Sequence, residues 1–148
     1  MNEQPEPEPK TVGETVRSGS VRIAGEQDIL RARQQARKVA ESMEFRITDV
    51  TRIVTAVSEL ARNIHLYAGE GVMRWREISD GARSGIELTF DDDGPGIEDV
   101  QGVLQGSHST SDRGMGRGIQ GTKKLMDDFE IATDPDDGTT ITIRKWHR

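Results

Sequence analysis

Apolar side chains recur along this chain at two different spacings, and each spacing predicts one kind of element. Over residues 26–43, and again over 48–69, apolar positions return every three or four residues, which is the period of a helix with one buried face. Shorter stretches at 21–23, 72–78 and 86–90 alternate apolar and polar side chains, as half-buried strands do. The first part of the chain is therefore predicted to form a strand, two helices and a hairpin of two strands.

The rest of the chain has weaker periodicity but clear turn residues. A short helix is expected over 98–104, and a longer helix is expected to open in a glycine run and to end near Phe129. Two last strands are expected around Ile131 and Ile141, joined across 134–138. This order does not alternate strand and helix as a parallel doubly wound sheet does. We therefore expect an α/β (α+β) fold in which helices cover one face of a mostly antiparallel sheet.

Composition narrows the range of functions. The chain has 148 residues and a net charge of −6, so we expect one domain whose main function is not nucleic-acid binding. Because the chain has no cysteine, disulfides, thiolate metal sites and a cysteine nucleophile are excluded. No segment resembles a signal peptide or a membrane span, which favours the cytoplasm.

The first residues differ in composition from the rest of the chain. Residues 1–16 are rich in Glu and Pro and contain few apolar side chains. Proline has no N–H and like charges repel one another, so this segment is expected to be a disordered acidic tail. The folded domain is then expected over 17–148.

Three polar segments carry residue types that suit a nucleotide. Glu59 and Asn63 lie one turn apart on the second helix, where a carboxylate can accept a proton and an amide oxygen suits Mg²⁺. After Phe90, a run of aspartates meets Gly-Pro-Gly, and a buried carboxylate there can accept a hydrogen bond from the amine of adenine. In the run from Gly114 to Gly121, the bare N–H groups of a helix start suit phosphate oxygens.

Each of these segments alone also fits a simpler interpretation. The polar pair fits a solvated helix face, the aspartates before Gly-Pro-Gly fit a turn, and the glycine run fits a flexible hinge. The GxGxxG spacing over 116–121 does not indicate a dinucleotide site, because no hydrophobic strand precedes it. Four glycines in a helical segment are costly without a use, at roughly 0.5–1 kcal/mol each relative to Ala. The functional interpretation of each segment therefore depends on the others.

Taken together and in order, the segments resemble the sequence boxes of the GHKL ATPases, the group that includes gyrase B, histidine kinases and MutL. Residues 59–63 resemble the N box, 92–96 resemble the DxGxG box, the run from Gly114 resembles the next glycine box, and 138–140 resemble the last Gly-Thr box. The likeness covers about residues 16–148. It implies the Bergerat fold, a two-layer sandwich of a mixed, mostly antiparallel sheet with helices on one face.

Within this family the chain is most similar to the small bacterial anti-sigma-factor serine/threonine kinases, and among these to the RsbT type, the switch kinase of the stressosome. The resemblance implies an ATP-dependent kinase that phosphorylates a Ser or Thr of a STAS-domain partner and so controls a sigma factor or another stress output. The residues that carry this likeness are Glu59 to Ile64, Leu66 to Gly69, Ser109 to Ser111, Leu125 to Phe129, and Lys145 with Trp146.

The resemblance also implies a role for each matching residue. Glu59 would be the general base, and Asn63 would bind both ATP and Mg²⁺. Asp92, rather than Asp93, would bind the adenine amine, with support from Thr139. The other expected ATP-binding residues line the base, wrap the phosphates or belong to a lid over 106–113: Gly94, Gly96, Ser109, Thr110, Gly114, Met115, Gly116, Arg117 and Gly118.

Two other functions stay open. A kinase of the RsbW or SpoIIAB type, which binds a sigma factor directly, has the same boxes, and only the presence of Glu59 disfavours a non-catalytic, nucleotide-gated binding module. A phosphatase is a further candidate partner, whereas neither nucleic acid nor a membrane is expected. Arg117 stands where related sequences carry a small or apolar residue. It is expected to neutralise phosphate charge, contact the partner or point to solvent.

Overall fold

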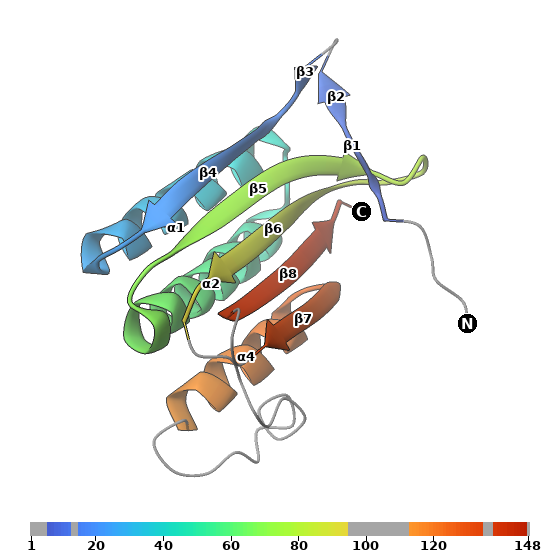
Figure 1. Cartoon of the computed structure of the whole chain (residues 1–148). Helices are drawn as coiled ribbons and strands as arrows, with labels where there is room; N and C mark the ends of the chain where they lie inside the picture. Colours follow the sequence, from blue (N-terminus) through green and yellow to red (C-terminus); the bar gives the residue numbers. More distant parts are fainter. Residues whose placement is uncertain (1–5, 13–14, 95–112, 135–137, 148) are drawn as a thin grey trace.

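The helices of the protein lie in one layer against one face of its sheet (Figure 1). The computed structural model describes residues 6–12, 15–94, 113–134 and 138–147. Within them, the helices are α1 (Glu26–Ser42), α2 (Ile47–Asn63), the π-helix η1 (Ile64–Ala68) and α4 (Arg113–Leu125). None of these described helices is long and apolar enough to cross a membrane. The expected α+β class with helices on one face is confirmed.

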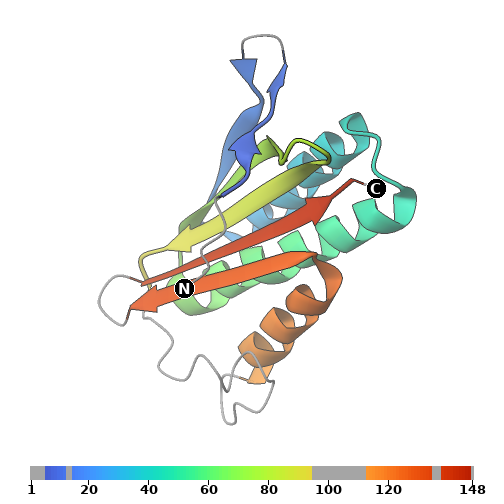
Figure 2. The same cartoon turned by 90° about the vertical axis from the view of Figure 1, so that its right-hand side faces the viewer.

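The main sheet has the strand order β1-β5-β6-β8-β7, and β4 also pairs with β5. All of its described pairings are antiparallel. A separate pair of short strands, β2 and β3, projects away from the main sheet at the top of the view in Figure 2. The strands are β1 (Glu8–Pro9), β2 (Thr11–Val12), β3 (Thr15–Val16), β4 (Ser18–Ile23), β5 (Gly71–Ser79), β6 (Ser84–Asp92), β7 (Asp128–Asp134) and β8 (Gly138–Trp146).

The core fills the space between the sheet and the helices. Every second side chain of a strand points to the helices, so that Met73, Phe90 and Ile141 form one buried row across β5, β6 and β8. The helices meet this row with apolar stripes, of which the predicted α2 stripe is fully buried at Ile53 and Val57. The last residue of β6 and the first residues of β8 therefore lie opposite the C-terminal half of α2.

Two predicted helix boundaries are wrong. The last helix ends at Leu125, not near Phe129, because Phe129 pairs with Ile143 in β7 and alternates with polar neighbours as a strand residue does. The second helix begins at Ile47, one residue before Thr48, and the short helix expected over 98–104 lies outside the described residues.

The segment expected as a tail contains strands. Glu8 pairs with Ser79 and Pro9 with Ile78, and the Lys10 N–H donates to the Glu77 carbonyl oxygen at 2.7 Å. This pairing uses backbone groups of β5 that lie past Arg76, the residue that pairs with the first residue of β4. It therefore needs no apolar side chains from the tail. Composition alone could therefore not reveal it.

Candidate functional site

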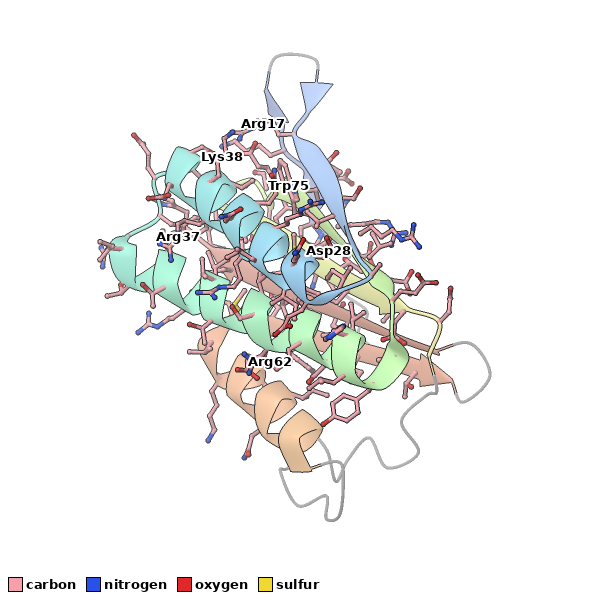
Figure 3. All side chains as sticks on the ribbon, turned by 90° about the vertical axis from the view of Figure 1, so that its left-hand side faces the viewer. Arg17, Asp28, Arg37, Lys38, Arg62 and Trp75 are labelled. Carbon is pink, nitrogen blue, oxygen red and sulfur yellow. The ribbon has the colours of Figure 1, made fainter. Side chains whose placement is uncertain are left out.

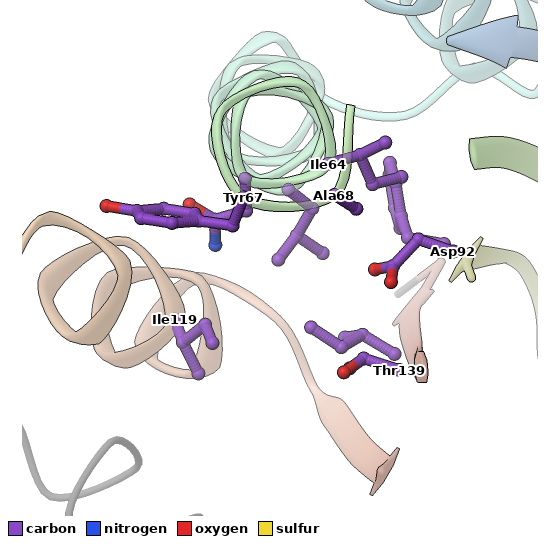
Figure 4. A pocket seen from close by; sticks show the side chains of 10 residues that line it. Ile64, Tyr67, Ala68, Asp92, Ile119 and Thr139 are labelled. Carbon is purple, nitrogen blue, oxygen red and sulfur yellow. The ribbon is translucent and has the colours of Figure 1, made fainter. Parts of the chain in front are cut away.

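A cavity lies between α2, η1 and α4 on one side and the ends of β6 and β8 on the other (Figure 4). It is partly open to solvent. Apolar walls with a few polar groups at fixed places are typical of small-ligand sites. The lining residues are Leu60, Asn63, Ile64, Tyr67, Ala68, Phe90, Asp92, Ile119, Thr139 and Ile141.

Asp92 lies at the sheet end of the cavity. Its Oδ1 accepts the Gly94 N–H at 2.9 Å, and the backbone N–H of Thr139 also donates to this carboxyl group. Burial raises the pKa of Asp92, and these two hydrogen bonds lessen the rise. Strand alternation turns Asp91 and Asp93 away, and Asp93 is exposed. Because a carboxylate has about four acceptor sites, Asp92 keeps capacity for a donor on a ligand.

Gly138, the first residue of β8, lets Thr139 lie against Asp92. Gly138 has a φ of 91°, and a Cβ at this position would collide with the backbone oxygen of Asp92. Only glycine allows both this conformation and this close approach. The Thr139 hydroxyl is 3.0 Å from the Thr133 hydroxyl, so Thr139 supports Asp92 through its backbone N–H.

Glu59 and Asn63 lie on the side of α2 that faces α4. A Cβ at Gly118 would lie 3.0 Å from Glu59 Oε2 and 3.7 Å from Asn63 Oδ1, so the bare backbone of Gly118 lies close to both side chains. Asn63 Nδ2 is buried and has no hydrogen-bond partner among the described residues. A buried amide without a partner is costly, so this end of the cavity is suited to a polar ligand.

The π-helix η1 brings two further side chains to the cavity. The Gly69 N–H donates to the Ile64 carbonyl oxygen at 2.8 Å, which is the i→i+5 bond of a π-turn. Tyr67 and Ala68 then line the cavity, and the Tyr67 ring extends toward α4 (Figure 4). The sequence analysis did not assign Tyr67 to the site. Its spacing of four residues from Asn63 was the available signal.

Of the other predicted site residues, some are described by the structure and some are not. Gly94 lies against Ala68, whose Cβ would be 2.5 Å from a Cβ added at Gly94. The first turns of α4 contain predicted residues whose backbone is helical and whose side chains are not described: Gly114, Met115, Gly116 and Arg117. Gly96, Ser109 and Thr110 lie outside the described residues. So does the lid expected over 106–113, except for its last residue, Arg113, which begins α4.

The structure therefore brings five of the predicted residues to one cavity or to its edge. Asn63 lines the cavity at its α2–α4 end, with Glu59 and Gly118 beside it, and Asp92 and Thr139 line the sheet end. In the described part of the chain, no group of three His, Cys, Asp or Glu side chains could hold a metal ion alone. A cation beside Asn63 would therefore need ligand atoms from a bound molecule.

Known proteins share this sequence and this fold. Residues 24–145 match the family model of the histidine kinase-like ATPase domain. The serine/threonine-protein kinase RsbT of Bacillus subtilis (strain 168) is 44% identical over 128 residues, which cover 86% of this chain and 96% of that protein. The anti-sigma F factor of Thermoanaerobacter sp. (strain X514) is 29% identical over 78% of this chain and 82% of its own length.

A solved structure agrees in fold alone. A chain from the SiaB–SiaC complex of Pseudomonas aeruginosa matches with a TM-score of 0.54 and 10% identity, covering 88% of this chain and 90% of that chain. The family match confirms the expected Bergerat-type fold, and an ATPase domain implies that the protein binds ATP. This chain is a homologue of the kinase RsbT, and it belongs to the histidine kinase-like ATPase family.

Proposed function

We propose that the protein is an ATP-dependent serine/threonine protein kinase that phosphorylates a STAS-domain partner in a bacterial partner-switching pathway of the stressosome type. The observation that carries this proposal is a cavity lined by Asn63 at one end and Asp92 at the other, with Glu59 and Gly118 directly beside Asn63. The identity to the kinase RsbT supports the reaction and, with it, a cytoplasmic location.

The residues at the two ends of the cavity support one orientation for ATP. The carboxyl group of Asp92 accepts hydrogen bonds, so it suits the exocyclic amine of adenine and not the carbonyl that guanine presents at the same position. The phosphates would then extend toward Asn63 and the first turns of α4. There, backbone N–H groups and the positive end of the helix dipole attract anions.

Asn63 fits a magnesium ion that arrives with the nucleotide. Asn63 lines the cavity, and its amide oxygen is a hard ligand of the kind that Mg²⁺ takes, because the ion needs few protein oxygens when phosphate oxygens complete its shell. The unpartnered Nδ2 is a donor and suits a phosphate oxygen instead. When bound, the ion would neutralise phosphate charge.

Glu59 would accept the proton of the acceptor hydroxyl. The hydroxyl oxygen forms a bond to the γ-phosphorus, the bond from that phosphorus to the β–γ bridging oxygen breaks, and ADP leaves. The side chain of Glu59 is 34% exposed and has an ion-pair contact with Arg62 at 3.7 Å, so it can be reached by a hydroxyl group on another protein. Positioning and charge neutralisation supply most of the catalysis in phosphoryl transfer.

The test is transfer of label from [γ-³²P]ATP to a purified STAS-domain protein in the presence of Mg²⁺. We expect label on one Ser or Thr, and Glu59→Gln should reduce the transfer rate by about 10²–10⁴-fold while ATP affinity stays nearly unchanged. Intact ATP binding with no label on the STAS protein would contradict the kinase proposal. Equal activity of Glu59→Gln and wild type in a functional assay would favour the nucleotide-gated binding module.

A second candidate function is supported by the likeness to anti-sigma F factors. A kinase of this kind would also bind a sigma factor directly. A pull-down with purified sigma factors in the presence of ATP or ADP separates the two candidates, because only the second predicts a stable complex.

A further inference from the structure

The strands β4 and β7 lie at opposite edges of the main sheet (Figure 1). An edge strand has backbone N–H and C=O groups that can pair with another strand, and proteins usually protect such edges with charged side chains. On β7, Asp128 and Glu130 are acidic, and Glu130 is 64% exposed. The only charge in β4 is on Arg22, which forms an ion pair with Glu70 at 2.8 Å. The edge at β4 is therefore the one that is open to another strand.

The pairing of β4 with β5 decides which of its residues turn their backbone to the free edge. The Glu77 N–H donates to the Arg17 carbonyl oxygen at 3.0 Å, so Arg17 and every second residue after it exchange hydrogen bonds with β5. Ser18, Ser20 and Arg22 then direct their N–H and C=O groups outward. No described strand pairs with these groups, and the three side chains are exposed. Three residues of β4 are thus ready to pair with a further strand.

A groove beside this edge leaves room for such a strand. It runs between β4 and α1 and is lined by side chains from both, including Asp28, Gln34, Gln35 and Lys38. Figure 3 shows Asp28 and Lys38 on the side of α1 that lies next to β4. Because side chains of a strand alternate between the two faces of a sheet, half of those on an added strand would enter this groove.

The sequence of β4 is complementary to itself. If two copies of β4 pair antiparallel around Ser20, the two Ser20 residues lie opposite each other, and Ser18 lies opposite Arg22. All three outward residues are used in this register, and about six backbone hydrogen bonds would form. On the helical side, Val21 of one copy would lie opposite Gly19 of the other, so a large side chain meets none. No two like charges lie directly opposite each other along the paired strands.

The α1 side of the groove fits the same arrangement. α1 follows β4 after a two-residue connection and lines the groove with it. Ser20 lies three residues before the end of β4, a distance of about 10 Å along a strand, which equals about seven residues of helix. Near the axis between the two copies, α1 would therefore present Gln34 and Gln35. These neutral amides can donate and accept hydrogen bonds, so they do not repel their own copies.

We propose that β4 is a dimerisation edge, at which two copies of this chain join β4 to β4 antiparallel, so that one continuous sheet runs through both. A second copy fits this edge because the edge complements itself in register, size and charge, whereas the acidic side chains of β7 disfavour the same pairing there. None of the β4 residues lines the cavity that contains Asp92, so the dimer leaves both cavities accessible. The proposal goes beyond the kinase reaction and does not depend on it.

Single cysteines test the arrangement, because the chain has no cysteine of its own. In the proposed dimer the two Ser20 Cα atoms would lie about 5.5 Å apart, within the range of about 4.4–6.8 Å that a disulfide requires. The two Ser18 residues would be at least about 13 Å apart, since four residues of strand separate them. Under mild oxidation, Ser20→Cys should therefore form a disulfide-linked dimer at least 10-fold faster than Ser18→Cys. The two variants are matched, because both change an exposed serine of the same strand.

Analytical ultracentrifugation at several protein concentrations measures the dimer directly. Ser20→Pro removes an outward N–H that β5 does not use, and proline is tolerated at such a position of an edge strand. We expect this variant to dimerise at least 10-fold more weakly than wild type, while Ser20→Ala, which keeps the N–H, stays within about 2-fold of wild type. Urea unfolding checks that both variants are folded. If Ser20→Pro does not fold, the two cysteine variants still decide.

A wild type that stays monomeric at every concentration would overturn the inference. So would equal rates of disulfide formation in the two cysteine variants, or a folded Ser20→Pro that dimerises as strongly as wild type does. If the wild type were monomeric and a STAS-domain protein protected the backbone N–H groups of Ser18 and Ser20 from hydrogen exchange, the edge would serve another protein, and the two-copy proposal would fail. Failure of the kinase proposal looks different, because it shows as absent label on the STAS protein and leaves the dimer unchanged.

Discussion

Two carboxyl groups on the same strand, β6, one buried and one half-buried, have opposite surroundings. Glu87, on the open face of the sheet, is 7% exposed and accepts hydrogen bonds from Arg76 at 2.7 Å and Arg144 at 2.9 Å. Asp92, at the strand end on the helical face, accepts hydrogen bonds from the backbone N–H groups of Gly94 and Thr139. No described cation pairs with Asp92.

The difference shows how one strand can hold a structural and a functional carboxyl group. Burial alone would raise the pKa of both groups, but for Glu87 the hydrogen bonds from Arg76 and Arg144 outweigh burial and lower its pKa. For Asp92, burial prevails and the pKa is raised. Glu87 has its charge compensated within the protein, whereas Asp92 keeps acceptor capacity that a ligand can use.

Removing Glu87 should have the largest effect, and it should fall on stability. Glu87→Leu leaves two arginines without their shared carboxylate, one of which, Arg144, is 6% exposed. Loss of one member of a buried ion pair typically costs about 3–5 kcal/mol, so we expect the free energy of unfolding in urea to fall by about 3 kcal/mol. Glu130→Leu is the control: it touches the same Arg144 at 3.5 Å, but Glu130 is 64% exposed, and a change of less than about 1 kcal/mol is expected. Equal costs for the two variants would contradict the assignment.

Removing Asp92 should weaken ATP binding. Asp92→Ala deletes a hydrogen bond between a charged group and the ligand, worth about 1.5–3 kcal/mol, which corresponds to a loss of about 10–100-fold in ATP affinity by calorimetry. Asp93→Ala next to it should bind ATP as wild type does, because Asp93 is exposed. If Asp93→Ala weakened ATP binding as much as Asp92→Ala, the assignment of the adenine carboxylate would be wrong.

Sequence patterns predicted more of the fold than of the site. The strands and helices followed from periodicity, and the α2 stripe is the buried stripe of the structure. Periodicity failed where a local pattern serves two purposes: Phe129 continued the apolar spacing of α4, yet its pairing with Ile143 places it in β7. The π-turn that brings Tyr67 to the cavity also leaves the ordinary helical period, so only the coordinates reveal it.

The candidate site was predicted as a set of polar residues, and the structure adds how they are held. Asp92 could be preferred over Asp93 on likeness, and the strand register supplies the physical reason. Apolar wall residues such as Leu60 and Ile119 could not be separated from the core by sequence, because a cavity wall and a core have the same apolar residues. Long-range pairing, which decides such cases, is not a local property of the chain.

The two carboxyl groups should also give opposite pH dependences of stability in the absence of nucleotide. A raised pKa means that Asp92 favours folding when protonated; this contribution is complete below the ordinary carboxyl pKa of about 4 and is lost as pH rises through the folded value. Asp92→Asn should therefore be more stable than wild type at neutral pH and similar to it near about pH 3. The lowered pKa of Glu87 gives a contribution present above the ordinary value and lost as pH falls through the folded one. Glu87→Gln should accordingly destabilise most at neutral pH.

Urea unfolding at several pH values measures both trends. The quantity to compare is the free energy of unfolding of each variant minus that of wild type. If this difference changed with pH in the same direction for Asp92→Asn and Glu87→Gln, the comparison would be contradicted. Stability is the appropriate readout here because it reports the carboxyl groups of the free protein and needs no ligand.

The smallest effect is expected at Thr139, and it follows from what holds Asp92. The resemblance to the family implies that Thr139 supports the adenine carboxylate, Asp92, and its hydroxyl would be the obvious group to do so. In the structure that hydroxyl pairs with Thr133 at 3.0 Å, and the Thr139 backbone N–H donates to Asp92. Thr139→Val keeps this N–H and nearly the same volume, so ATP affinity should fall by no more than about 3-fold, while one neutral hydrogen bond, worth about 1 kcal/mol of stability, is lost.

A fall in affinity close to that of Asp92→Ala would mean that the hydroxyl turns to the carboxylate or to the nucleotide when ATP binds. A small fall would instead show that Asp92 is positioned by backbone groups, which side-chain substitution does not remove, whereas Glu87 is positioned by two arginines that substitution can remove.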